Sequence, residues 1–250
     1  MIAAAIRTLA LAAALVPTAA QAASPCAPDE IGITACKSDR TEYRIIRGTM
    51  SPGKHYGLAW STEGKNRTDF KLQNGNARYG GDEIPTFVIR LADGKMLAKL
   101  ATMHRGDDQS YNHLTLHAAW SPDESWLIAS SESKWHTDSA SVLHIGKDSV
   151  SLLFNPLPVC LDAERSGLKT AGKRVDFGKF EHSMYFKSVG NDGSVAAVCL
   201  MQIPKQDEDY TFLARLKLAI AGKSISAKLD TVKQCPELQG DCAVSDNPVE

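Results

Sequence analysis

Short apolar runs alternate with turn residues along most of this chain. In the clearest example, apolar residues at 117–120 lead into the turn Ser-Pro-Asp-Glu at 121–124, and a second apolar run leaves it at 126–128. The same design surrounds the turns at 51–54 and 191–194, so the three turns recur at an interval of 70 residues. Apolar runs of this length, bounded by Pro, Gly, Asn and Asp, predict β-strands joined by tight turns.

The three turns belong to three predicted units of four antiparallel strands each. The expected strands lie at 43–46, 56–60, 86–91 and 95–100 in the first unit, at 114–120, 126–130, 141–145 and 150–154 in the second, and at 184–189, 195–201, 210–220 and 225–232 in the third. Each unit has a core of about 40–45 residues, the size of a propeller blade. The predicted fold class is all-β, with at least three antiparallel four-stranded, blade-like repeats.

Longer polar segments connect the units. The sequence predicts a turn-rich arm at 23–41, a Gly- and Asn-rich loop at 63–83, a polar connection at 155–182 with one or two helical turns near 161–168, and a Cys-Pro-Gly tail at 233–250. Because the turns between strands are scaffold, we expect function in the insertions at 63–83, 104–113 and 155–182.

A known repeat matches the second unit. The run W-S-P-D-E-S-W-L-I-A-S at 120–130, followed by V-L-H-I-G-K-D at 142–148, resembles the repeat of PD40/TolB-like and WD40-like β-propellers. In that repeat an apolar strand, Ser-Pro-Asp-Gly and a second apolar strand make the first hairpin of a blade. F-V-I-R-L-A-D-G-K-M-L at 87–97 looks like the second hairpin. The resemblance implies a propeller-like scaffold and no particular activity.

The number of units departs from that resemblance, since propellers usually have four to eight blades. Either a further blade lies in 23–41 and 155–182, or the propeller is incomplete, or two chains complete a ring as a homodimer. A β-sandwich with internal repeats is the alternative fold.

The N-terminus has the pattern of a signal peptide. Residues 1–16 are apolar or small apart from Arg7, Pro17 breaks the run, and Ala-Gln-Ala at 20–22 supplies a cleavage site near Ala22. The apolar run is shorter than the ~20 residues of a membrane span. We therefore expect a signal peptide at 1–22, a single β-rich domain at 23–250, no membrane span, and a periplasmic or secreted location.

The net charge of the chain bears on which classes of partner it can bind. Removal of Arg7 with the signal peptide leaves 27 basic and 29 acidic residues, a net charge of −2. This balance argues against nucleic acid or an anionic membrane surface as the main partner, because both require a concentrated basic face.

Six cysteines in an exported chain indicate disulfides. The first-choice pairing is Cys26–Cys36, Cys160–Cys199 and Cys235–Cys242; a rival pairing would join the N-terminal pair to the C-terminal pair. Intervals of nine and six residues within the terminal pairs do not match the C-x₂₋₄-C spacing of zinc sites.

Reactive side chains concentrate in one segment and the loop that follows the next strand: His104, Asp107, Asp108, His113, His117, His136 and Asp138. On a strand His113 and His117 would share a face. Such a set could hold a divalent metal or form an acid/base pair, or it could be a polar loop beside a half-solvated strand.

Some of the tryptophans are candidate binding residues, and the chain carries none of the common catalytic motifs. Trp60 and Trp120 are expected to pack between sheets, whereas Trp126, Trp135 and His136 lie near polar loops and are the candidate binding residues. The nucleophile elbow, zinc-protease, P-loop and dinucleotide motifs are all missing. We expect an exported binding or scaffold module that engages a protein or envelope component through its inter-blade loops, without catalysis or cofactor. The alternative is a metal-assisted hydrolase that uses the segment 104–117 and His136.

Overall fold

The computed structural model describes residues 25–28, 34–38, 41–61, 69–73, 76–80, 86–100, 115–132, 137–146, 150–203, 209–221, 224–235 and 240–242. The predicted signal peptide at 1–22 lies outside these ranges, as do the candidate side chains His104, Asp108, His113, Trp135 and His136. What the sequence predicts for those residues stays a prediction.

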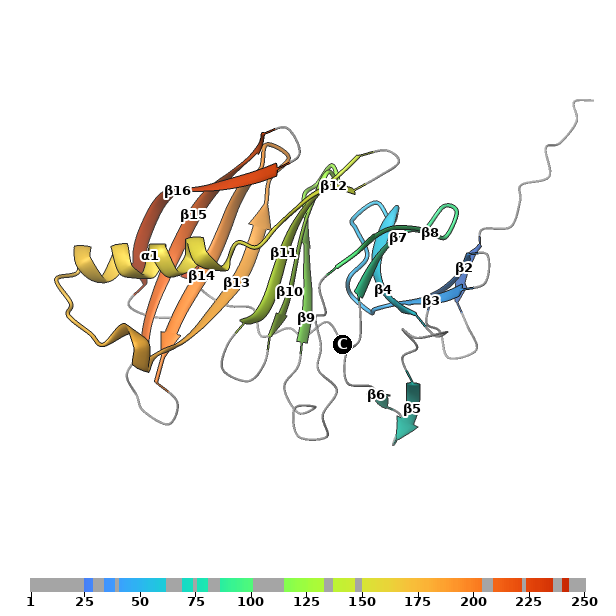
Figure 1. Ribbon diagram of the computed structural model, residues 1–250, viewed down its shortest axis with the longest axis horizontal. Helices are drawn as coiled ribbons and strands as arrows, with labels where there is room; N and C mark the ends of the chain where they lie inside the picture. Colours follow the sequence, from blue (N-terminus) through green and yellow to red (C-terminus); the bar gives the residue numbers. More distant parts are fainter. Residues whose placement is uncertain are drawn as a thin grey trace, which may run out of the picture.

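Three antiparallel sheets stand in a row (Figure 1). The first sheet has the order β1-β2-β3-β4-β7-β8 and consists of β1 (Cys26–Pro28), β2 (Thr34–Ser38), β3 (Thr41–Ile45), β4 (Tyr56–Ser61), β7 (Thr86–Arg90) and β8 (Lys95–Lys99). The second consists of β9 (Thr115–Trp120), β10 (Trp126–Glu132), β11 (Thr137–Ile145) and β12 (Val150–Phe154). The third consists of β13 (Glu181–Val189), β14 (Ser194–Gln202), β15 (Asp209–Ala221) and β16 (Ser224–Cys235).

Every strand predicted for the three units is present close to its expected bounds, which confirms the all-β, antiparallel prediction. In the part of the chain that the structure describes, the sheets form an open row and not a closed ring. None of the described helices is long and apolar enough to cross a membrane.

The connections contain more regular structure than the sequence predicts. The arm at 23–41 contributes the hairpin β1–β2, and the loop at 63–83 contains the hairpin of β5 (Asp69–Gln73) and β6 (Asn76–Gly80). The connection at 155–182 contains α1 (Leu157–Thr170), a helix of 14 residues where one or two turns were expected, and the 3₁₀ turn η2 (Phe177–Lys179). A second 3₁₀ turn, η3 (Gly240–Cys242), lies in the tail.

The second sheet is covered on both faces. On β10, Trp126 and Ile128 belong to the core that joins the second sheet to the third, while Leu127 and Ala129 belong to the core that joins it to the first. All four side chains are at most 5% exposed. A strand buried on both faces is an unbroken apolar run and not an alternation, as W-L-I-A shows here.

The N-terminal end of the row is closed by curling of the first sheet. Its outer face carries a core of its own, which includes Cys36, Tyr43 and Phe87. The backbone oxygen of Lys37 on β2 lies 3.0 Å from the position that a Cβ on Gly94 would occupy, so the hairpin β1–β2 reaches the turn between β7 and β8. The sheet therefore folds back over its own apolar face.

The C-terminal end is closed by the tail. Val198, Leu213, Cys235 and Cys242 form a small core on the outer face of the third sheet. Lys187 Nζ donates a hydrogen bond of 2.8 Å to the backbone oxygen of Asp241 and helps to hold η3 there.

The three disulfides of the structure are the first-choice pairs: Cys26–Cys36, Cys160–Cys199 and Cys235–Cys242. The first lies in the N-terminal hairpin and the third in the C-terminal tail, so each end of the row has one. The second ties α1 to β14. Disulfides at these places indicate an oxidising compartment.

We expect the disulfides to differ in their contributions to stability. Under the chain-entropy model, loss of the Cys160–Cys199 link, with its separation of 39 residues, costs about 4 kcal/mol, and loss of Cys235–Cys242, with a separation of 7, about 2 kcal/mol. Urea unfolding of the two paired Cys→Ala variants measures this difference. Equal losses would contradict the expectation.

The repeated turn has the same geometry in all three units. In each, the first residue accepts a hydrogen bond from the amide of the fourth, and the fourth residue has positive φ: Lys54 (59°), Glu124 (62°) and Gly193 (76°). The third turn is therefore 190–193, one residue earlier than the sequence alignment of the turns suggests.

Side chains tie each turn to the next. The Glu124 carboxylate accepts a hydrogen bond of 2.5 Å from the Gly53 amide and lies 2.5 Å from His55 Nδ1. The Asp123 amide donates to Asn191 Oδ1 at 3.0 Å. Burial of Glu124 would raise its pKa, but hydrogen bonds from Ser51, His55 and Gly53 outweigh this effect and lower it. The turns thus form a connected ladder along one edge of the row.

Glu124→Ala should lower the free energy of unfolding by about 2–3 kcal/mol, because the Gly53 amide and His55 lose a largely buried acceptor. Asp192→Asn is the matched control, since Asp192 contacts Ser194 and Lys217 within one sheet. Urea denaturation compares the two. A loss no larger than that of the control would show that the ladder is not a stabilising contact.

Candidate ligand-binding cleft

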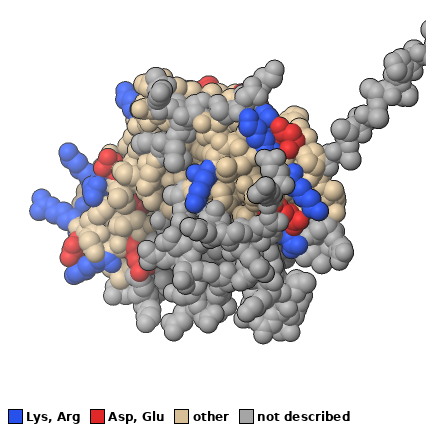
Figure 2. All heavy atoms as spheres, turned by 45° about the vertical axis from the view of Figure 1, so that its right-hand side comes forward, with Lys and Arg blue, Asp and Glu red and all other residues tan. Residues whose placement is uncertain are grey.

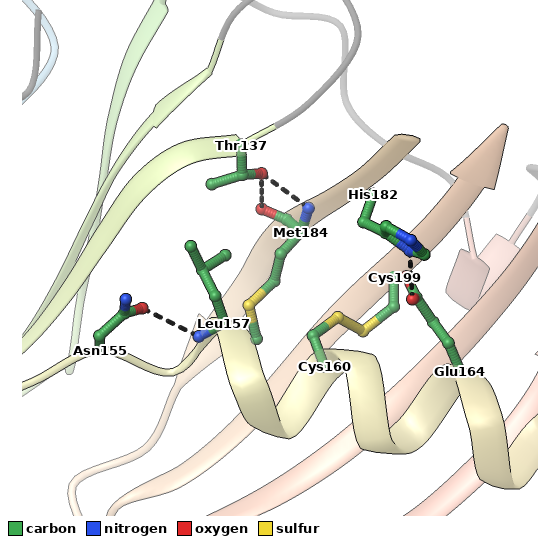
Figure 3. The surroundings of a disulfide bond; sticks show 8 residues. All are labelled: Thr137, Asn155, Leu157, Cys160, Glu164, His182, Met184 and Cys199. Atoms are coloured by element: carbon green, nitrogen blue, oxygen red, sulfur yellow. Dashed lines mark hydrogen bonds and ion pairs between the residues drawn. A yellow bond between two sulfur atoms is a disulfide. The ribbon is translucent and has the colours of Figure 1, made fainter. Parts of the chain in front are cut away.

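A cleft of about 440 Å³ lies between α1 and the edge of the third sheet, beside the start of β11. Its lining is mostly apolar and consists of Thr137, Leu157, Cys160, Leu161, Glu164, Glu181, His182, Ser183 and Met184. Figure 3 shows Glu164 reaching from α1 toward His182 on β13, beside the Cys160–Cys199 disulfide.

The local sequence explains where α1 begins and ends. Pro156 stands at its N-cap, and Asn155 Oδ1 accepts a hydrogen bond of 3.0 Å from the Leu157 amide. At the other end Gly172 adopts a φ of +67°, and the amide of Lys173 donates to the oxygen of Leu168 at 2.9 Å. This is the Schellman pattern, in which Gly is favoured because the left-handed conformation costs it little.

Packing fixes the helix against the third sheet. A Cβ on Gly167 would lie 2.3 Å from the ring of Phe212 on β15, so only glycine permits this close approach. Cys160 and Ala163 face the same core, and the disulfide to Cys199 holds the first half of the helix. These contacts fix which side of α1 faces the third sheet, and Glu164 lies on that side.

Glu164 is the unusual residue of this face, because its side chain is 0% exposed. One carboxylate oxygen, Oε2, lies 2.7 Å from Nδ1 of His182. The other, Oε1, has no hydrogen-bond partner among the described residues. Burial raises the pKa of the Glu164 carboxyl, and the hydrogen bond and charge of His182 offset only part of that rise.

Aromatic and basic side chains support His182 from the solvent side. Its ring lies 4.5 Å from that of Phe177 on η2, and the Arg165 guanidinium lies over the same Phe177 ring at 4.5 Å. Arg165 is further bound to Asp162 on the exposed side of α1. The imidazole is 24% exposed, so it stands between the buried carboxylate and water.

The second sheet contributes the far wall. Thr137 Oγ1 accepts a hydrogen bond of 2.8 Å from the Met184 amide and lies 3.4 Å from the Met184 oxygen, to which its hydroxyl donates. This pair joins β11 to β13 across the boundary between the sheets. The cleft is thus formed by three separate segments of the chain.

Comparison with protein-family models and with curated proteins found no match. The cleft combines apolar walls with a buried carboxylate, Glu164, that has one oxygen without a partner among the described residues. This arrangement is typical of a ligand site in which a few polar groups orient a mainly apolar molecule.

The sequence-derived candidates that the structure describes do not line this cleft. Trp126 is 5% exposed and packs in the core, where its ring lies 4.9 Å from that of His144, so it does not offer a surface for stacking. Trp120 packs between sheets as predicted, with its ring 6.0 Å from Tyr56 and its Nε1 donating to the Thr49 oxygen. His117 lies on β9. No group of three or more His, Cys, Asp or Glu fit to hold a metal occurs among the described residues.

Sequence reasoning missed Glu164 and His182, although it expected function in the segment 155–182. The two residues are separated by 18 positions, and only the return of the chain after α1 brings them together. Pro156, Gly172 and the apolar positions between them are the signals from which a longer helix could have been predicted.

Glu164→Gln should change how stability depends on pH. Because burial raises the pKa of the folded carboxyl above the ordinary value of 4.5, the contribution of the wild-type carboxyl is fully present below that value and is lost as pH rises through the folded pKa. The free energy of unfolding of the variant should therefore rise relative to that of the wild type as pH rises above about 4.5.

Urea unfolding at several pH values checks this expectation, with Asp162→Asn on the exposed face of α1 as control. Parallel pH profiles for Glu164→Gln and wild type would show that the carboxyl titrates as it does in the unfolded chain.

Proposed function

We propose that this chain is an exported binding module that holds an apolar ligand in the cleft between α1 and β13. The observation that carries the proposal is Glu164: a fully buried carboxylate with one oxygen unpaired among the described residues, in the wall of a mostly apolar cleft. A buried polar atom without a partner costs about 1–3 kcal/mol, which a ligand that donates to it can recover.

The fold favours binding over a purely structural role. The insertion at 155–182 interrupts an otherwise regular row of sheets, and α1 shares the inner face of the third sheet with the second sheet. A volume of about 440 Å³ is within the range of small-molecule sites. The insertion therefore adds a pocket to the scaffold, as expected of an inter-blade segment that carries function.

The surroundings fit an extracytoplasmic role. Three disulfides indicate an oxidising compartment, and the proposed signal peptide at 1–22 would deliver the chain there. On the face shown in Figure 2, acidic and basic side chains of the described residues lie interspersed. This distribution agrees with a partner or envelope component that is recognised by shape and local chemistry, and not by a field of one sign.

Binding of N-phenyl-1-naphthylamine, a neutral apolar fluorophore, tests the proposal. We expect a saturable rise in its emission with the wild-type chain. Leu161→Trp places a larger ring in the cleft and should weaken dye binding by at least about tenfold, because a filled cavity has no room for the ligand. The matched control is Ser166→Trp, which adds the same ring to the exposed side of α1.

Two results would contradict the proposal. One is the absence of saturable dye binding to the wild type. The other is equal binding to Leu161→Trp and Ser166→Trp, which would place the dye outside the cleft.

A further inference from the structure

We infer that the cleft selects organic amines: a protonated primary or secondary amine on an apolar body, with an N–H that donates to Glu164 Oε1. This inference rests on the proposed function, because it names the chemistry of the ligand in the same cleft.

The two carboxylate oxygens of Glu164 differ in their hydrogen bonding. Oε2 of Glu164 already has His182 Nδ1 at 2.7 Å, whereas Oε1, buried in the wall of the cleft, has no partner among the described residues and is the oxygen left for a ligand donor. An ionised carboxylate oxygen can only accept hydrogen bonds, so the matching ligand group is a donor. A charged donor forms a shorter and stronger bond to it than a neutral one.

The charged side chains around the cleft favour one sign of ligand charge. Glu164 on α1, Glu181 on β13 and His182 line the cleft, and Glu181 already has an interaction of its own. The Arg165 guanidinium is held over Phe177 and bound to Asp162, on the exposed side of the helix. The ionised carboxylate of Glu164, with one oxygen unpaired among the described residues, therefore favours a cationic ligand and disfavours an anionic one.

The rest of the cleft wall is apolar. Leu157, Leu161 and Met184 and the Cys160–Cys199 disulfide provide a surface that suits an alkyl chain or a ring. A small hydrophilic amine would leave this surface uncovered and would lose the contribution of apolar burial, about 25 cal/mol per Å². The expected ligand has an ammonium head and an apolar body.

Displacement of N-phenyl-1-naphthylamine by three matched competitors tests the inference at neutral pH. Hexylamine, 1-hexanol and hexanoate share one alkyl chain and differ in the head group. We expect hexylamine to displace the dye at a concentration about tenfold lower than hexanol, since a charge-assisted hydrogen bond replaces a neutral one. Hexanoate should be the weakest competitor.

Glu164→Gln keeps the size of the side chain and removes its charge. In this variant the preference for hexylamine over hexanol should fall from about tenfold to less than about twofold. Asp162→Asn removes a carboxylate from the exposed side of the same helix and should keep the wild-type preference. Circular dichroism confirms that each variant is folded, and the wild-type series decides the question if Glu164→Gln is not.

The outcomes separate the two proposals. If the dye binds in the cleft but hexylamine competes no better than hexanol, or if Glu164→Gln keeps the preference, the amine inference is overturned while the binding function stands. If no saturable dye binding occurs, the proposed function itself fails.

Discussion

Every sheet in this protein has two faces, and the fold is determined by how each apolar face is covered. The second sheet solves the problem by lying between the other two, with Trp126 and Ile128 on one side and Leu127 and Ala129 on the other. A closed propeller would cover the outer faces of the first and third sheets with further blades. This row is open, so its ends need covers of their own.

The covers come from segments outside the repeats. The hairpin β1–β2 curls over the first sheet, and the tail with η3 covers part of the third, each with its own disulfide. Terminal repeats that differ from the internal ones are the general solution for arrays of repeated units. The polar residues Arg215, Lys217 and Asp230 line a pocket of the third sheet.

The candidate site follows from the same constraint. The strands of the third sheet are long, and their inner face is shared by the second sheet and by α1. Where the helix meets the edge strand β13, the covering is incomplete and a cleft remains. Glu164 lies on the buried face of α1 because Cys160, Ala163 and Gly167 fix the rotation of the helix. A residue that would be costly in a core becomes useful beside a cleft.

The strands could be predicted from the sequence by itself, since short apolar runs bounded by turn residues are local signals. For the disulfides the sequence favoured the observed pairs but left a rival pairing open, and the contact between Cys160 and Cys199, which are 39 residues apart, is not a local signal. The continuous run W-L-I-A at 126–129 predicts a strand but does not tell which sheets cover it. Trp126 is buried and not on the surface, because packing against segments distant in the sequence decides which residues are exposed. The helix was underestimated because Pro158 and Gly167 weaken its local signal, and its stability depends on the disulfide and on Phe212. The contact between Glu164 and His182, and with it the cleft, was decided only by the tertiary structure, since it joins a helix face to a strand edge that no sequence period relates.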